Sequence, residues 1–303
     1  MNLPDGLTAR PLGIDDAAAV TAVMAASELA ILGRVLIEEA YLLGDWNRPS
    51  FDISAGTVGV FDGEELLGYA EVSGPGRGDA AVHPDHLGRG IGTWLATWMQ
   101  DAALAQGQTE IGMPVPAGSP GEQLLRALGY RVRWESWMLE LPTGREIASP
   151  ALPEGYQVRI AGPDDITAAW TVTEDAFLEW SVRPRQPLED WAAGVTGLPT
   201  YRPWNLQVVL APDGSVAGTV HVTLDSTEPI GFVDKVAVRA DQRGRGLAKA
   251  LLATAFASAR EHGAERSELS TDSRTGALDL YLGLGMEVTS TWVNLGVDLQ
   301  PRL

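Results

Sequence analysis

The sequence predicts an α/β protein of the α+β type, with two tandem domains that each hold a mixed, mostly antiparallel central sheet flanked by helices. Three observations lead to this prediction: an internal repeat, a hairpin-turn pair in each copy, and a glycine-rich loop between a strand and a helix in each copy. The length of 303 residues suits two domains, since one domain takes roughly 100–200 residues.

The repeat is clearest at the glycine-rich loops. Residues 82–92 read VHPDHLGRGIG and residues 238–248 read VRADQRGRGLA, at an offset of 156 (238 − 82). The same offset aligns LRALGY at 125–130 with YLGLGM at 281–286. The chain is therefore a duplication.

The earlier parts of the two copies correspond at a shorter offset. Gly68 aligns with Gly218 at an offset of 150 (218 − 68), so the second copy has gained 6 residues (156 − 150) before its glycine loop. Both copies open alike, with RPLGIDD at 10–16 and RIAGPDD at 159–165.

A linker separates the copies. Turn-forming residues punctuate this stretch: Pro142, Gly144, Pro150, Pro153 and Gly155. We therefore expect an N-terminal domain at 1–142, a linker at 143–154 and a C-terminal domain at 155–303.

Within each copy the elements follow one order. A short strand leads into helical segments with acidic residues near their start, and two alternating strands follow. Asp62-Gly63 and Asp213-Gly214 are typical of hairpin turns. The strands around them are expected at 57–63, 65–72, 205–214 and 215–224.

After the hairpin, a strand enters the glycine loop and a long amphipathic helix leaves it. These helices are expected at 91–106 and 246–262. A further strand (109–115 or 265–270), a short helix and a terminal hairpin-like stretch complete each copy.

Composition narrows the classes of function. The absence of cysteine excludes disulfides and thiolate chemistry, and no metal-binding spacing joins the four histidines: His83, His86, His221 and His262. The net charge of −18 disfavours nucleic-acid binding. It is compatible with a cationic substrate, although acidity that serves only solubility is the stronger alternative. No apolar run approaches the roughly 18 residues of a membrane span, and the N-terminus lacks signal-peptide features. We expect a cytoplasmic protein without a metal, a nucleic-acid partner or a membrane partner.

The glycine-rich loops suit the binding of an anion. Glycines let backbone N–H groups approach a ligand, and a helix N-terminus presents unpaired donors to a pyrophosphate. The loops are not a dinucleotide-binding fingerprint, because they follow hairpins and no ribose-binding acid sits on a second strand. They are not Walker A loops, because no Gly-Lys-Ser/Thr follows.

On these residues the chain resembles the GCN5-related N-acetyltransferases, the GNAT superfamily, twice over nearly its whole length. The family's pyrophosphate-binding signature Arg/Gln-x-x-Gly-x-Gly/Ala is similar to RGRGLA at 243–248. LGRGIG at 87–92 keeps the glycines but has Leu87 in place of the Arg or Gln. The resemblance implies that acetyl-CoA is held by Val236, Ala237, Val238, Arg243, Gly244, Arg245, Gly246, Leu247 and Ala248, and in the first copy by Gly88, Arg89, Gly90, Ile91 and Gly92. It further implies a bulge in the strand that enters the loop, and a backbone N–H there for the oxyanion.

The family's later signature, Asn-x-x-Ala-x-x-x-Tyr-x-x-x-Gly-Phe, is similar to residues 274–286, with Arg274 for Asn and Met286 for Phe. The resemblance assigns to Tyr281 the protonation of the leaving thiolate after direct attack of the amine on the thioester. Leu125 stands at the equivalent position of the first copy and has no proton to give. We therefore expect an active C-terminal domain and a catalytically degenerate N-terminal one.

Asp234 is the candidate proton acceptor, because an alkylamine needs help to lose its proton at neutral pH. It lies on the strand before the loop, on the face of Phe232 and Val236, and a carboxylate among apolar neighbours would have a raised pKa. Pairing with Lys235 is an equally weighted structural alternative. Weaker candidates for the base are His221, Asp225 and Asp272.

The acceptor of the acetyl group stays open. Residues 177–205 gather aromatic and acidic side chains that would suit an ammonium group, although packing of this insertion is the stronger alternative: Trp180, Trp191, Tyr201, Trp204, Glu179, Glu189 and Asp190. The tandem arrangement resembles that of mycothiol synthase, in which the C-terminal domain is the working one. Aminoglycosides, polyamines, amino acids and peptide amines remain open.

The resemblance therefore predicts an N-acetyltransferase that transfers acetyl from acetyl-CoA to a primary amine of a small molecule or peptide. The alternative is a non-catalytic acyl-CoA-binding or sensor protein, and retention of Tyr281 and Arg243 in one copy favours the enzyme. A purely structural duplicate is disfavoured, because packing alone does not require both glycine loops. The two copies are compatible with a monomer or a homodimer.

Overall fold

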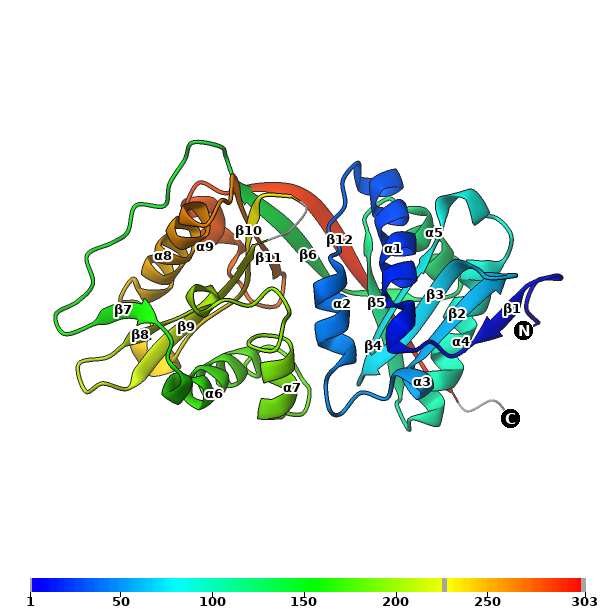
Figure 1. Cartoon of the computed structure of the whole chain (residues 1–303), viewed down its shortest axis with the longest axis horizontal. Coiled ribbons are helices and arrows are strands. Elements are labelled where there is room, and N and C mark those ends of the chain that lie inside the picture. The colour runs from blue at the N-terminus through cyan, green and yellow to red at the C-terminus, as the bar shows by residue number, and fades with distance from the viewer. Residues whose placement is uncertain (1, 225–227, 301–303) are drawn as a thin grey trace. The chain divides into compact units, whose positions relative to one another are not determined.

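The computed structural model describes residues 2–224 and 228–300 of the chain (Figure 1). Unit 1 comprises Met1–Ser136 with Ser290–Leu303, and unit 2 comprises Trp137–Thr289. Each unit combines a sheet with helices, so the predicted fold class is confirmed. No helix in the two described ranges has the length and apolar character needed to cross a membrane.

Unit 1 is built around an antiparallel sheet with the order β1-β2-β3-β4. Its strands are β1 (Thr8–Arg10), β2 (Thr57–Asp62), β3 (Glu65–Gly74), β4 (Arg77–Val82) and β5 (Glu110–Pro116). Its helices are η1 (Ile14–Asp16), α1 (Ala17–Leu32), α2 (Glu39–Trp46), α3 (Ile53–Gly56), η2 (Pro84–His86), α4 (Ile91–Ala105) and α5 (Pro120–Ala127). One core lies under α4 and α5, and a second core lies under α1 and α2 on the other face.

Unit 2 repeats this plan with the strand order β11-β10-β9-β8-β7. Its strands are β7 (Gln157–Ile160), β8 (Leu206–Leu210), β9 (Val216–Leu224), β10 (Ile230–Val238) and β11 (Arg266–Asp272). Its helices are η3 (Pro163–Asp165), α6 (Ile166–Phe177), α7 (Leu188–Ala193), η4 (Pro203–Asn205), η5 (Ala240–Gln242), α8 (Leu247–Glu261) and α9 (Leu278–Gly283). α8 and α9 contribute to one core, and α6 and α7 to the other.

The remaining two strands have residues in both units. β6 (Arg131–Leu141) ends in unit 2, and most of β12 (Glu287–Asp298) belongs to unit 1, where it pairs with β5. The units therefore differ from the linear division expected at residues 143–154. The physical reason is burial, because the end of β6 joins the α8 core and the end of β12 joins the α4 core.

These two strands also correct the expectation of a terminal hairpin-like stretch in each copy. Each is one continuous strand. A tight hairpin needs a turn residue with positive φ, and no residue of β6 or β12 has one, Gly296 included.

The similar openings of the two copies have a structural explanation. Arg10 forms two hydrogen bonds to the Asp16 carboxylate, at 2.9 and 2.7 Å, and Gly13 N donates to that carboxylate at 2.9 Å. Asp165 receives the same contacts, from Arg159 at 2.5 and 2.9 Å and from Gly162 N at 2.7 Å. The aspartate thus caps the turn that begins the first helical segment.

We expect Asp165→Ala to lower the free energy of unfolding by about 1 kcal/mol, because it removes this cap and the partner of Arg159. Asp164→Ala is the matched control, since Asp164 is the exposed neighbour and surface changes usually stay within about 0.5 kcal/mol. Urea unfolding followed by circular dichroism measures both. Equal stability of the two variants would contradict the capping role.

Candidate active site

The glycine loop of unit 2 forms a cradle of unpaired backbone donors. Gly244 and Gly246 have φ of 74° and 80°, in the left-handed region that favours glycine, and Gly246 caps α8. Arg243 N donates to Ala240 O, and the next N–H with an acceptor is that of Ala250, which donates to Gly246 O. Among the described residues, the N–H groups of 244–249 have no partner, as an anion site at a helix N-terminus requires.

Unit 1 keeps the same cradle. Gly88 and Gly90 have φ of 75° and 85°, and Gly90 caps α4, whose first buried residue is Ile91. Gly92 has a packing role, because a Cβ there would lie 2.9 Å from Leu124 Cδ2. Arg89 of this loop contacts His86, with 2.9 Å between Arg89 Nη1 and His86 Nδ1.

β10 separates from β11 beside the cradle of unit 2. Their parallel pairing runs from Ile230 with Arg266 to Val233 with Leu269, where it ends. At the same point the pairing of β10 with β9 shifts register, between Val233 and Lys235, so Asp234 is bulged. The bulge that the family resemblance implied is present.

The bulge leaves one edge of β10 without a strand. Arg239 N donates to Ala217 O of the neighbouring strand, so the alternation of an antiparallel ladder directs the N–H groups of Val236 and Val238 away from β9. Ala237 points into the α6 core instead. The N–H groups of Val236 and Val238 are therefore positioned for a ligand between β10 and β11.

Arg243 holds a carboxylate of its own chain. Its two terminal nitrogens each lie 2.7 Å from an oxygen of Glu179, and its Nε donates to Val238 O at 3.1 Å. The Arg243 contact lowers the pKa of Glu179. Of the other loop residues, Arg245 is exposed, Leu247 is buried under the helix, and Ala248 is half-buried.

Asp234 lies between two partners. Its Oδ2 accepts from Lys235 Nζ and lies 3.1 Å from His221 Nδ1. Burial would raise the pKa of Asp234, but Lys235 and then His221 lower it well below its usual range. The expected raised pKa is therefore corrected, because the sequence could not place two hydrogen-bonding partners on this carboxylate.

His221 is buried and poorly satisfied. Its Nε2 has no hydrogen-bond partner among the described residues. Burial lowers its pKa more than Asp234 raises it, so the ring is neutral. Asp272, another candidate base, is committed to Arg274 at 2.5 Å, and Asp225 lies outside the described residues.

Tyr281 lies on α9 and is 7% exposed. Burial raises its pKa to about 12. Its hydroxyl forms no hydrogen bond within the described ranges, so its proton is available to a ligand. Leu125 occupies the equivalent place on α5 and is a core residue of unit 1.

Two tryptophans of the 177–205 stretch pack in the cores, and a third contacts an arginine. Trp191 and Trp204 are buried in the cores, as the packing alternative proposes. Trp180 instead lies 4.8 Å from the Arg274 guanidinium. Sequence reasoning missed the contact of Glu179 with Arg243, because 64 residues separate the two and no spacing rule joins them.

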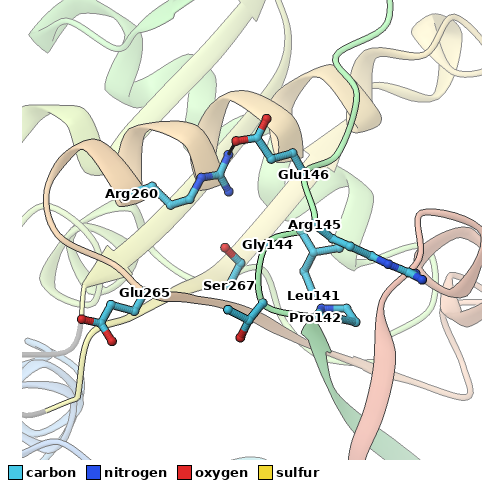
Figure 2. Close-up of a pocket in the computed structure, with 9 residues that line it drawn as sticks. Leu141, Pro142, Gly144, Arg145, Glu146, Arg260, Glu265 and Ser267 are labelled. Carbon is cyan, nitrogen blue, oxygen red and sulfur yellow. Dashed lines mark ion pairs between the residues drawn. The ribbon is translucent and has the colours of Figure 1, made fainter.

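A separate pocket of about 80 Å³ lies at the other end of α8 (Figure 2). Arg260 points toward Glu146, at 3.6 Å, and Ser267 is another lining residue. α8 has 15 residues, so at about 1.5 Å per residue this pocket is roughly 20 Å from the glycine loop. It contains none of the expected site residues.

Comparison with known proteins agrees with this geometry. The acetyltransferase (GNAT) family model matches residues 30–130 and 167–286. A mycothiol acetyltransferase of Thermobispora bispora is 29% identical over 279 residues, covering 89% of this chain and 92% of the relative. One of Streptomyces coelicolor is 30% identical over 244 residues, covering 77% and 76%.

Solved structures are similar over both units. A GCN5-related N-acetyltransferase from Sphaerobacter thermophilus has a TM-score of 0.75 and 28% identity, covering 100% of this chain and 98% of the other. A tandem GNAT protein from the clavulanic acid biosynthesis pathway has a TM-score of 0.73 and covers 98% and 100%. Its 19% identity supports the fold alone.

We expect His221 to make unit 2 sensitive to acid. The folded ring resists protonation, whereas the unfolded ring takes up a proton as the pH falls through its ordinary value of 6.5. Folding stability is therefore lost below that pH, by up to about 1.4 kcal/mol per pH unit. The lowered pKa of Asp234 acts in the same direction but only at pH values below about 3.9.

His221→Gln removes the titration, so the variant should lose less stability than the wild type between pH 7 and 5.5. Urea unfolding at both pH values measures the two differences. Equal losses in the two proteins would show that His221 takes up its proton as readily in the folded state as in the unfolded one.

Proposed function

Because the chain belongs to the acetyltransferase (GNAT) family and is an acetyl-transferring enzyme, we propose that unit 2 transfers acetyl from acetyl-CoA to a primary amine. The observation that carries this proposal is that one unit combines three features: an unpaired N–H cradle, an open strand edge and a buried tyrosine with a free hydroxyl.

The cradle and the open edge suit different parts of acetyl-CoA. The N–H groups of residues 244–248, with the Arg243 guanidinium, would hold its pyrophosphate. Val236 and Val238 would hydrogen-bond its pantetheine arm, and one of their N–H groups would stabilise the oxyanion, as preorganised donors do in acyl transfer.

The reaction needs two proton movements. The amine nitrogen bonds to the thioester carbon while the carbon–sulfur bond breaks. Tyr281 gives its proton to the departing sulfur, and its raised pKa keeps it protonated at neutral pH.

Asp234 takes the proton of the amine in this proposal. Because Lys235 and His221 hold its pKa low, Asp234 is ionised and attracts an ammonium. The same low pKa means that the proton passes on to solvent instead of remaining on Asp234.

Unit 1 is the catalytically degenerate copy in this proposal. Leu125 replaces the tyrosine and has no proton to donate. Its cradle remains compatible with an anion. The proposed roles thus assign catalysis to the C-terminal copy and leave the N-terminal copy able to bind CoA or to support the fold.

The acceptor proposed for the first assay is the desacetylated form of mycothiol, because the curated relatives carry the name mycothiol acetyltransferase. A cationic amine also suits a protein with a net charge of −18. Release of free CoA thiol that depends on this amine supports the proposal. Saturable acetyl-CoA binding without turnover of any primary amine in a broad panel would favour the acyl-CoA sensor instead.

We expect Tyr281→Phe to lower kcat about 10²- to 10⁴-fold, the usual contribution of a positioned acid. The Kd for acetyl-CoA should stay unchanged, because the variant alters proton donation and not the cradle. Tyr130→Phe is the matched control in unit 1, and its kcat should equal that of the wild type. Unchanged kcat in Tyr281→Phe at saturating substrates would remove Tyr281 from the mechanism.

We expect Glu179→Gln to tighten acetyl-CoA binding about two- to fivefold, because Glu179 competes for Arg243 and exposed ion pairs contribute about 0.2–1 kcal/mol. Asp175→Asn, which removes the nearby partner of Arg185, is the control. Gly246→Glu should abolish the site, through its carboxylate and its positive φ. Calorimetric titration measures all three variants. Weaker binding in Glu179→Gln would show that the ion pair supports the site rather than competing with it.

A further inference from the structure

Unit 1 contains a cavity that the proposed acetyl transfer does not use. Its volume is about 110 Å³, several times the roughly 10–15 Å³ that one water needs. Its apolar and phenolic lining residues include Met24, Leu42, Tyr41 and Tyr69. Three acids, Asp45, Glu71 and Asp79, and one base, Arg77, also line it. The cavity therefore has space for a small organic group, and its lining holds three acids against one arginine.

The two acids lie opposite each other on neighbouring strands. Glu71 of β3 and Asp79 of β4 are partners in the antiparallel register, which brings their side chains together. Glu71 is 5% exposed, and its Oε2 accepts from Trp46 Nε1 at 2.9 Å. The other Glu71 oxygen, Oε1, accepts no hydrogen bond from the described residues. Glu71, which lines the cavity, thus has one carboxylate oxygen that receives no hydrogen bond from the described residues.

The electrostatic surroundings favour a positive ligand. Burial raises the pKa of Glu71 to about 7, with a further contribution from Asp79, and burial also raises the pKa of Asp79. The charged and titratable groups around this pair are Glu28 of α1, Asp45 of α2, Tyr69 of β3 and Arg77 of β4. Three of these four are acids or a phenol, and Arg77 lies 3.6 Å from Asp45. A cation in the cavity would compensate the two carboxylates.

The chemistry of the lining identifies the kind of cation. Among residues 2–224 and 228–300, no group of three or more His, Cys, Asp or Glu is placed to hold a metal ion. Methionine, leucine and phenol side chains instead suit the carbon chain of an amine, and tyrosine faces attract ammonium groups.

The equivalent position of unit 2 does not carry a pair of facing acids. At the offset of 150, Glu71 corresponds to His221 (71 + 150), and the register partner of His221 is Lys235. An imidazole ring and an ammonium replace the two facing acids at this position of unit 2.

We propose that unit 1 binds a small primary alkylammonium in this cavity, with its nitrogen at Glu71 and Asp79 and its carbon chain between the apolar and phenolic walls. The copy without the catalytic tyrosine is thereby a ligand-binding domain. This site is separate from the acetyl-transfer site proposed for unit 2.

The test is calorimetric titration of the full-length protein with n-butylamine hydrochloride, and with 1-butanol as the neutral probe of the same size. We expect saturable binding of butylamine and none of butanol. Glu71→Gln and Asp79→Asn should each weaken binding about tenfold, because each replaces a carboxylate by a neutral amide and so removes the charge that strengthens the hydrogen bond to the ammonium. Glu64→Gln removes the same charge from an exposed position of the β2–β3 turn and should leave the affinity unchanged.

The pH dependence provides a second readout. A cation binds the ionised form of Glu71, so affinity should rise about tenfold between pH 6 and 8 for a pKa of about 7. Tyr281→Phe should retain the site in unit 1, which separates this proposal from the fate of the acetyltransferase mechanism.

Several outcomes would overturn the proposal: no saturable butylamine binding to the wild type, equal binding of butanol, or equal weakening by Glu64→Gln. Thermal unfolding of each variant shows whether it is folded. Asp79→Asn keeps a hydrogen-bond acceptor for Ala80 N and Tyr69, so it gives the answer if Glu71→Gln does not fold.

Discussion

The parallel hydrogen bonds between β10 and β11 stop at Val233 and Leu269, and the acetyl transfer proposed for unit 2 depends on this interruption. A continuous ladder would use the N–H groups of Val236 and Val238 internally. The bulge at Asp234 instead leaves them directed away from β9. The same strand then leads into the glycine loop, so an open strand edge and an anion cradle follow each other within a few residues. A thioester with a pyrophosphate tail needs both.

The two copies illustrate how one backbone plan supports different chemistry. Both keep left-handed glycines and a helix N-terminus whose first N–H groups have no acceptor in the described part of the chain. They differ in side chains of the regions that are proposed to bind ligands. Leu125 stands where the second copy has Tyr281, and Glu71 stands where it has His221. The two copies therefore share the part of the proposed site that depends on backbone geometry, and they differ in the part that depends on side-chain chemistry.

Ion pairs within the chain affect the charge and the availability of the groups that would contact a substrate. The chain has 40 acidic and 22 basic residues, so cationic side chains readily find carboxylates. Arg243 holds Glu179, and Lys235 holds Asp234. The first pair is half-exposed, and it contributes little to stability, so an anionic ligand can displace it. The second pair is more buried and keeps Asp234 ionised. In the proposed site, ligand affinity would therefore also depend on Glu179 and Lys235, which pair with the residues proposed to contact the ligand.

The sequence by itself determined the duplication, the fold class, the hairpins, the glycine loops and the contrast between Tyr281 and Leu125, because each is a local pattern with a fixed spacing. Only the tertiary structure decided the ends of β6 and β12, the low pKa of Asp234, the contact of Glu179 with Arg243, and the cavity at Glu71. These features join residues that are distant in the chain or set by strand register. Their contacts depend on the bulge in β10 and on which strands are buried. No spacing of residues along the sequence predicts either of these.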